Sequence, residues 1–220
     1  MDEPLVCCIL PYHTPDYYEQ AIECFHNQTY QKRILFSLNT SGWKLPVGTI
    51  RNLMIEDAPS GSVIAHLDHD DWSCPTRLAE QVAFLQSTGA CIVGYRDMPF
   101  YDVRTQQVTF YKQPRQNYAL GTSLMYWRSV WEQHPFIETL GDEDAKFEQA
   151  VGFDKVQTQS SITICGNFKP SDTTGYPWPR MVARIHPGNT SPKCGARYEK
   201  ATQELTAAVL ACIRAPINVR

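Results

Sequence analysis

The stretch that decides the fold is Ser62-Val63-Ile64-Ala65-His66-Leu67-Asp68-His69-Asp70-Asp71. Its first six residues are mostly apolar and include the β-branched Val63 and Ile64, which predicts a buried strand from Ser62 to Leu67. In an open α/β sheet, ligand groups lie outside the carboxyl ends of the strands. The sequence therefore predicts a cluster of carboxylates at the edge of a sheet where a ligand would bind.

Two strand-helix units are expected before this stretch. Leu5 to Leu10 is an apolar run ended by Pro11 and predicts a first strand. Thr14-Pro15-Asp16 then predicts the start of a helix, because threonine caps free amides and proline suits the first helical position. A second strand at Arg33 to Leu38 and a helix through Ile50, Leu53, Met54 and Ala58 complete the second unit.

The alternation continues beyond the aspartates. Ser73 and Pro75 predict another helix start, and Ala90 to Gly94 predicts a further strand. Later elements are shorter, with strands expected at Val108 to Tyr111, Thr122 to Trp127 and Ile162 to Ile164, a helix near Asp144 to Ala150 and a closing helix from about Tyr198. This pattern predicts an α/β fold with a mixed, mostly parallel central sheet flanked by helices.

Composition indicates one globular domain. The chain has 220 residues, and one core commonly serves ~100 to 250 residues. No stretch approaches the ~18 continuous apolar residues of a membrane span, and the amino terminus lacks signal-peptide features, so a cytoplasmic location is expected. The eight cysteines show no Cys-x-x-Cys spacing and predict reduced thiols. A net charge of −3 speaks against binding nucleic acid through bulk electrostatics.

The aspartates suggest a metal site. Two carboxylates separated by one residue at a strand end can converge on one hard divalent cation, and a diphosphate can supply further oxygen ligands. Three acidic residues in a turn are more often a solvated loop or a helix cap, so the residues alone leave both interpretations open.

Further motifs follow in a fixed order. Pro11-Tyr12-His13 follows the first strand, Gln28-Thr29-Tyr30 precedes the second, and Arg51-Asn52 lies in the next helix, before the aspartates. The second half adds Gly121-Thr122-Ser123-Leu124, Glu143-Asp144 and His186-Pro187-Gly188-Asn189-Thr190-Ser191. From about residue 5 to 191, this order resembles the family 2 glycosyltransferases of GT-A fold.

The resemblance implies a single GT-A domain with three parts. Residues 1–95 would form the nucleotide-sugar-binding half, residues 96–191 the acceptor-binding and catalytic half, and residues 192–220 a C-terminal helix. It also implies transfer of a sugar from a nucleotide-diphosphate donor to an acceptor hydroxyl, with inversion and with Mn²⁺ or Mg²⁺ as cofactor. The acceptor is not indicated, and a nucleic-acid acceptor is neither favoured nor excluded.

Residue roles are implied in the same way. Asp144 would be the catalytic base, and Asp70, Asp68 and His186 would serve the metal. The nucleotide-sugar-binding set would comprise Pro11, Tyr12, His13, Asn39, Arg51, Asp68, His69, Asp70 and Glu143. Trp72 and Trp178 are additional candidates for ligand contact, and the segment from about Gly166 to Arg180 is expected to be a lid.

Each role has a structural alternative. Glu143 and Asp144 could be helix-start acids stabilised by the macrodipole, His186 could be a structural histidine, and Arg51 could be a surface residue. Asn39 departs from the family pattern, in which acidic residues commonly end the second strand and read the base. Uridine is therefore the default only by resemblance.

Two other functions stay open. A nucleotidyltransferase would also place aspartates and a metal at strand ends, but it usually carries a glycine-rich phosphate loop, which Pro11-Tyr12-His13-Thr14 does not resemble. The other alternative is a catalytically inactive protein that binds nucleotide sugars.

Overall fold

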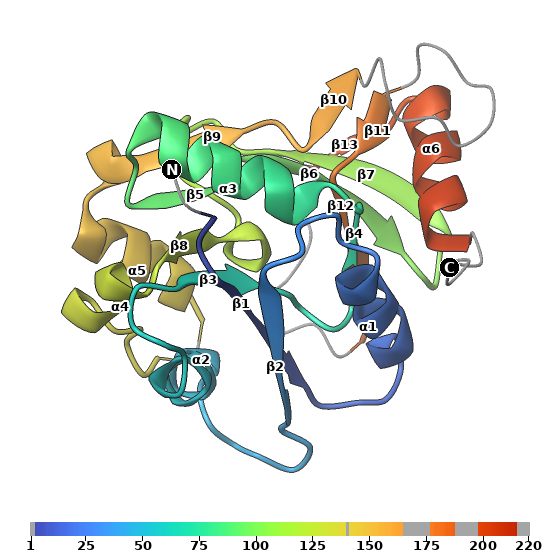
Figure 1. Ribbon diagram of the computed structural model, residues 1–220. Coiled ribbons are helices and arrows are strands. Elements are labelled where there is room, and N and C mark those ends of the chain that lie inside the picture. The colour runs from blue at the N-terminus through green and yellow to red at the C-terminus, as the bar shows by residue number, and fades with distance from the viewer. Residues whose placement is uncertain (1–2, 140, 165–176, 188–197, 215–220) are drawn as a thin grey trace.

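The computed structural model describes residues 3–139, 141–164, 177–187 and 198–214, and its main feature is a six-stranded sheet (Figure 1). Its strands are β1 (Val6–Tyr12), β2 (Arg33–Asn39), β3 (Val63–His66), β5 (Ile92–Tyr95), β8 (Met125–Trp127) and β9 (Val156–Gln159). They lie in the order β2-β1-β3-β8-β5-β9. β1 runs parallel to β2 and β3, β5 runs parallel to β9, and β8 is antiparallel to both of its neighbours. The expected mixed, mostly parallel sheet is confirmed.

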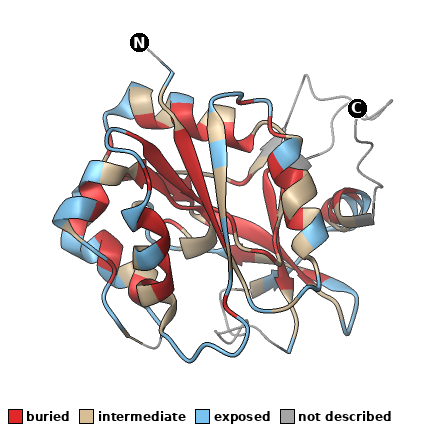
Figure 2. Ribbon diagram, turned by 60° about the horizontal axis from the view of Figure 1, so that its bottom comes forward, coloured by how far each residue is buried: buried red, intermediate tan, exposed pale blue. Residues whose placement is uncertain are grey.

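Helices cover both faces of this sheet in one domain. They are α1 (Tyr18–His26), α2 (Val47–Glu56), α3 (Arg77–Thr88), α4 (Arg128–Gln133) and α5 (Glu143–Val151). Side chains alternate along β1, so Cys7 and Ile9 pack with α2, α4 and α5, whereas Cys8 and Leu10 pack with α1 and α3. Figure 2 shows the resulting core, with buried strands between helices that expose their outer faces. A strand covered on both faces must be apolar on both, which explains the continuous apolar runs in the sequence.

A second, five-stranded sheet lies beside the first. It comprises β4 (Trp72–Ser73), β6 (Asp97–Asp102), β7 (Gln107–Lys112), β12 (Met181–Ile185) and β13 (Tyr198–Lys200), in the order β13-β7-β6-β12-β4. Helix α6 (Gln203–Arg214) packs on it through Leu205 and Val209. Trp72 packs against the same apolar cluster and is partly buried, and its expected role in ligand contact stays a prediction. The pair β10 (Ile162–Ile164) and β11 (Pro177–Pro179) is antiparallel.

Several expected boundaries were wrong for local reasons. Pro11 lies inside β1, because the register with β3 ends at Ile9 and the remaining residues pair only with β2, where a missing N–H is tolerated. Thr14 accepts a hydrogen bond from the backbone of Asp16, and α1 begins later, at Tyr18.

The third and the last helix also begin later than expected. Ser73 belongs to β4, and α3 begins at Arg77. Tyr198 belongs to β13, and α6 begins after Thr202, whose hydroxyl accepts the Leu205 N–H at 3.2 Å.

Two groups of expectations fall outside the described part of the chain. Residues 166–176 of the expected lid and residues 188–191 of the histidine motif are not described, and neither is the Trp178 side chain. Among the helices that the structure does describe, none has the length and apolar character needed to cross a membrane.

Candidate active site

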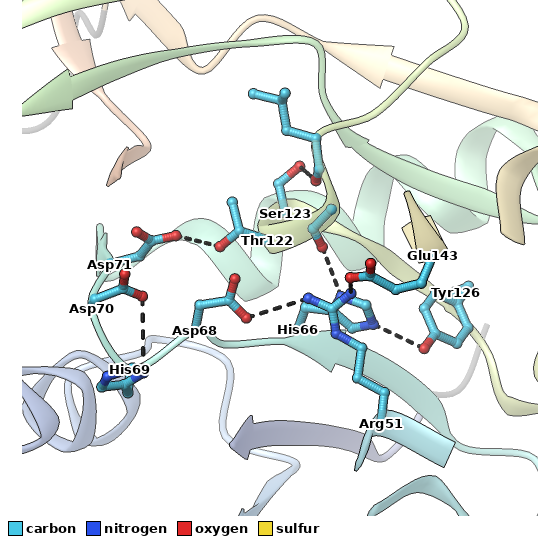
Figure 3. A network of polar contacts seen from close by, with 12 residues as sticks. Arg51, His66, Asp68, His69, Asp70, Asp71, Thr122, Ser123, Tyr126 and Glu143 are labelled. Atoms are coloured by element: carbon cyan, nitrogen blue, oxygen red, sulfur yellow. Dashed lines mark hydrogen bonds and ion pairs between the residues drawn. The ribbon is translucent and has the colours of Figure 1, made fainter. Parts of the chain in front are cut away.

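Most of the site residues expected from the sequence gather beyond the carboxyl end of β3. Figure 3 shows Asp68, His69, Asp70 and Asp71 on the turn that follows this strand, facing side chains from α2, α5 and the segment before β8. That segment contains a 3₁₀ turn, η1 (Gly121–Ser123). We call residues 119–123 the 119–123 loop.

Arg51 lies at the centre of the cluster. It is a buried residue of α2, and its Nη1 donates to Glu143 Oε1 at 2.9 Å. Its Nη2 lies 3.6 Å from Asp68 Oδ1. Burial alone would lower the pKa of Arg51, but nearby carboxylates raise the pKa overall. These carboxylates belong to Asp68, Glu143 and Asp144.

Glu143 and Arg51 therefore form a buried ion pair. Burial raises the pKa of Glu143, and the guanidinium opposes this effect. Breaking such a pair leaves the remaining charge buried without a partner, which is strongly destabilising. Arg51 is therefore a buried residue and not a surface residue of α2. It links α2 to α5 through Glu143 and also faces Asp68.

His66, the last residue of β3, holds the 119–123 loop through a hydrogen bond to its backbone. Its Nδ1 lies 2.7 Å from the carbonyl oxygen of Gly121, which can only accept, so Nδ1 carries the proton. Its Nε2 then accepts from the hydroxyl of Tyr126 at 3.0 Å. Burial lowers the pKa of His66 well below its usual value, so the ring is a neutral spacer between the loop and β8.

Asp70 meets His186, which follows β12. His186 Nε2 and Asp70 Oδ2 lie 2.9 Å apart, and His69 Nδ1 lies 3.9 Å from Asp70 Oδ1. Burial would raise the pKa of Asp70, but the hydrogen bond from His186 and the two neighbouring imidazoles together lower it. Burial lowers the pKa of His69, whose Nε2 has no hydrogen-bond partner among the described residues.

Asp71 points to the other side of the turn. Its carboxylate accepts a hydrogen bond from the hydroxyl of Thr122. The fully buried Arg77 donates from Nη2 to the carbonyl oxygens of His66, at 2.7 Å, and Thr122, at 3.2 Å. The aspartate turn, the end of β3 and the 119–123 loop are thus held as one unit.

Asp144, the second residue of α5, lies beside the same loop. Its backbone neighbour Ala145 donates an N–H to Asp144 Oδ1 at 2.8 Å. A Cβ placed on Gly121 would lie 2.2 Å from Asp144 Oδ2, so the carboxylate occupies the space that the glycine leaves. The loop and the predicted base are therefore packed directly against each other.

The remaining expected residues lie at the ends of β1 and β2. Asn39 pairs with Tyr12 in register, and its Oδ1 accepts the backbone N–H of Ser41 at 2.9 Å. The His13 ring packs edge-on against the His69 ring, with centroids 4.7 Å apart. Pro11 lies in the same end of β1. These residues form the rim of the site next to the aspartate turn.

Sequence reasoning missed His66 and Thr122 as parts of the site, and it included Asp71 in the carboxylate cluster without assigning it a contact. His66, a histidine at the end of an otherwise apolar strand and two residues before Asp68, was an available signal. Thr122 had none beyond its motif, because its contact with Asp71 spans 51 positions in the sequence.

The donor atoms suit a hard cation only in part. Asp70 and His186 bring a carboxylate oxygen and an imidazole nitrogen together, a set that suits Mn²⁺. No group of three or more histidine, cysteine or acidic side chains placed to hold a metal is found in the described ranges. Asp68 faces Arg51 at 3.6 Å. A bound ligand would have to complete any coordination shell.

The chain matches no known protein-family model, and no curated protein is similar to it in sequence at a significant level. Solved structures show a clear likeness in fold. The structure of S. aureus TarS matches with a TM-score of 0.55 and 15% identity, over 82% of this chain and 36% of that one.

Two further structures contain residues 1–349 of the same S. aureus protein. The complex with UDP-GlcNAc has a TM-score of 0.57 and 13% identity, over 84% of this chain and 60% of that one. The complex with UDP has a TM-score of 0.54 and 15% identity, over 83% of this chain and 61% of that one. The chain thus spans less than two thirds of each of these structures. At identities this low, the structural match establishes a shared fold and nothing finer.

Proposed function

We propose that this chain is a metal-dependent glycosyltransferase, related to family 2, that moves a sugar from a nucleoside-diphosphate sugar to an acceptor hydroxyl with inversion. The observation that carries the proposal is the meeting of Asp70 with His186 beyond the end of β3, on the turn where Arg51 joins Asp68 to Glu143. The fold supports it, because S. aureus TarS, which shares this fold, has been crystallised with UDP-GlcNAc. We propose a UDP-linked donor on the same ground.

Asp70 and His186 are the residues that would hold the divalent cation. Their donor atoms are already 2.9 Å apart, and the lowered pKa of Asp70 keeps its carboxylate charged at neutral pH. A bound cation would align the diphosphate and offset the charge that develops on it as the glycosidic bond breaks. Asp68 is assigned to the ribose or to the metal, with Arg51 setting its orientation.

Asp144 is the proposed catalytic base. An acceptor hydroxyl is a poor nucleophile, and a carboxylate within hydrogen-bond reach can take its proton as the new bond forms. Glu143, although adjacent, is committed to Arg51 and is therefore the less suitable base. The contact with Gly121 limits the positions that the Asp144 carboxylate can adopt.

Tyr12, His13 and Asn39 are proposed to contact the nucleoside. Because Asn39 Oδ1 accepts from Ser41, the NH₂ group of Asn39 is the part left to recognise a base. An amide NH₂ pairs with carbonyl oxygens, which uracil offers. His69 would help to shape the diphosphate side of the site through its contacts with His13 and Asp70.

The test is the release of nucleoside diphosphate from a panel of nucleotide sugars with Mn²⁺, with Mg²⁺ and with neither. We expect metal-dependent release, which Asp144→Asn lowers at least ~100-fold, the low end of general-base effects, with unchanged donor affinity. Pyrophosphate release from a sugar phosphate and a nucleoside triphosphate would indicate the nucleotidyltransferase instead. Donor binding without any release would indicate the inactive binding protein.

A further inference from the structure

Glu148 is a buried acidic residue that the proposed mechanism does not use. It lies on α5 and has no exposed surface. Its Oε2 accepts the backbone N–H of Ala119 at 3.0 Å. Its Oε1 is buried and has no hydrogen-bond partner within the described ranges.

The surroundings of Glu148 disfavour a charged carboxylate. A buried ion needs pairing or several hydrogen bonds, and this side chain has one. The groups that act on it electrostatically are Asp144, on the same helix, and Arg115 and Tyr118, on the segment that leads into the 119–123 loop. Arg115 stacks instead on the Phe153 ring, with its Cζ 4.5 Å from the centroid.

These effects do not cancel. Burial is the largest and raises the pKa of Glu148, the hydrogen bond from Ala119 lowers it, the charge of Asp144 raises it, and Arg115 lowers it. Together they raise the pKa to about 8. The geometry and the charges agree that this carboxyl group is largely protonated at neutral pH.

The position of Glu148 links it to Asp144. Residues four apart lie on the same face of a helix, so Asp144 and Glu148 both face the 119–123 loop. Glu148 binds the loop at Ala119, and Asp144 fills the space beside Gly121, two residues further on. The loop is therefore attached to α5 one helical turn from the carboxylate that it confines.

Resting on the proposed function of Asp144, we propose that Glu148 is its positioning residue: an uncharged carboxylic acid that anchors Ala119 and so holds Gly121 against Asp144. An ionised group there would place a second negative charge one turn from Asp144. A plain apolar side chain would release Ala119. A protonated carboxyl group provides the anchor without the charge.

The charge state is tested directly by NMR of protein with ¹³C-labelled glutamate carboxyl groups, in which Glu148→Gln identifies the Glu148 resonance. We expect a titration midpoint near 8, against ~4.3 for an ordinary glutamate. A midpoint above 7 supports the proposal, and a midpoint below 7 overturns it. This measurement needs no substrate, so it stands whether or not the chain transfers a sugar.

The anchoring is tested with two variants. Glu148→Gln keeps an oxygen for Ala119 and carries no charge. Its Gly121 amide resonance should therefore stay within the line width of the parent protein's resonance, and its kcat at pH 7 should stay within threefold of the parent value. Glu148→Leu removes the acceptor and should shift that resonance and lower kcat at least tenfold, with the donor KM within threefold. Glu148→Met is the nearly isosteric replacement if the leucine variant fails to fold.

The two proposals fail separately. An unshifted Gly121 resonance in the leucine or methionine variant overturns the anchoring, as does an equal loss of kcat in Glu148→Gln. A further readout is the alkaline limb of the pH profile, where the parent protein should lose rate above pH 8 and Glu148→Gln should not. If the parent protein turns over no nucleotide sugar, the proposed function fails, whereas the two NMR measurements still decide the role of Glu148.

Discussion

Replacement of Gly121 by alanine tests how the loop confines Asp144. The new Cβ would lie 2.2 Å from Asp144 Oδ2 and 2.9 Å from its Cβ and Cγ, whereas ordinary contact begins at 3.4 Å. The carboxylate must therefore retreat by about 1 Å, and a misplacement of that size can cost ~100-fold in rate. Because the Asp144 Cβ is also too close, rotation of the side chain alone cannot relieve the overlap, and we expect a loss of stability of about 1–3 kcal/mol, as for other overpacked sites.

The assay is metal-dependent release of nucleoside diphosphate, with donor affinity measured by calorimetry and stability by thermal unfolding. Gly121→Ala should lower kcat about 100-fold and leave donor affinity unchanged. Gly89→Ala is the matched control, because Gly89 has a φ of +64° with open space around it, at the end of α3. It should cost a similar ~1–2 kcal/mol without changing the rate. Full turnover in Gly121→Ala, or an equal loss of kcat in both variants, would refute the reasoning.

Three further perturbations address the buried charges and the metal. Arg51→Leu leaves Glu143 buried without its cation and should lower the free energy of unfolding, measured in urea titrations, by about 3–5 kcal/mol. Adding Glu143→Leu should recover part of this loss in the double variant. If the losses of the two single variants simply add in the double variant, the ion pair is contradicted. Glu148→Gln should match the parent protein in stability below pH 4.5 and exceed it increasingly up to pH 8, because a raised folded-state pKa makes stability fall as pH rises between the two values. The gain should reach about 4 kcal/mol near pH 7.5, and a difference independent of pH would rule out the raised pKa. Asp70→Asn should abolish Mn²⁺-dependent binding of UDP in calorimetry, since an amide keeps the shape of the carboxylate and lacks its charge, and unchanged affinity would remove Asp70 from the ligand set.

The sequence predicted the first half of the fold more accurately than the second. Strands β1, β2 and β3 were expected within two residues of their bounds. β1 and β3 lie inside the sheet, where strands buried on both faces require continuous apolar runs, whereas β2 is an edge strand whose side chains are intermediate or exposed. Strand β6 was missed, since Asp97 and Pro99 disfavour a strand locally although its central residues are buried in the second sheet. Strand β9 and helix α4 were missed as well, because their short segments show little periodicity.

What the sequence determined by itself is the placement of the acidic site residues at the end of a strand or the start of a helix. The aspartates follow β3 and the acidic pair begins α5 because apolar periodicity fixes where those elements end and begin. Only the tertiary structure decided which side chains meet. Arg51 binds Glu143 across 92 positions, and Asp70 meets His186 across 116. Such pairs depend on strand order and on the packing of distant helices, and no local pattern of apolar and polar residues encodes either.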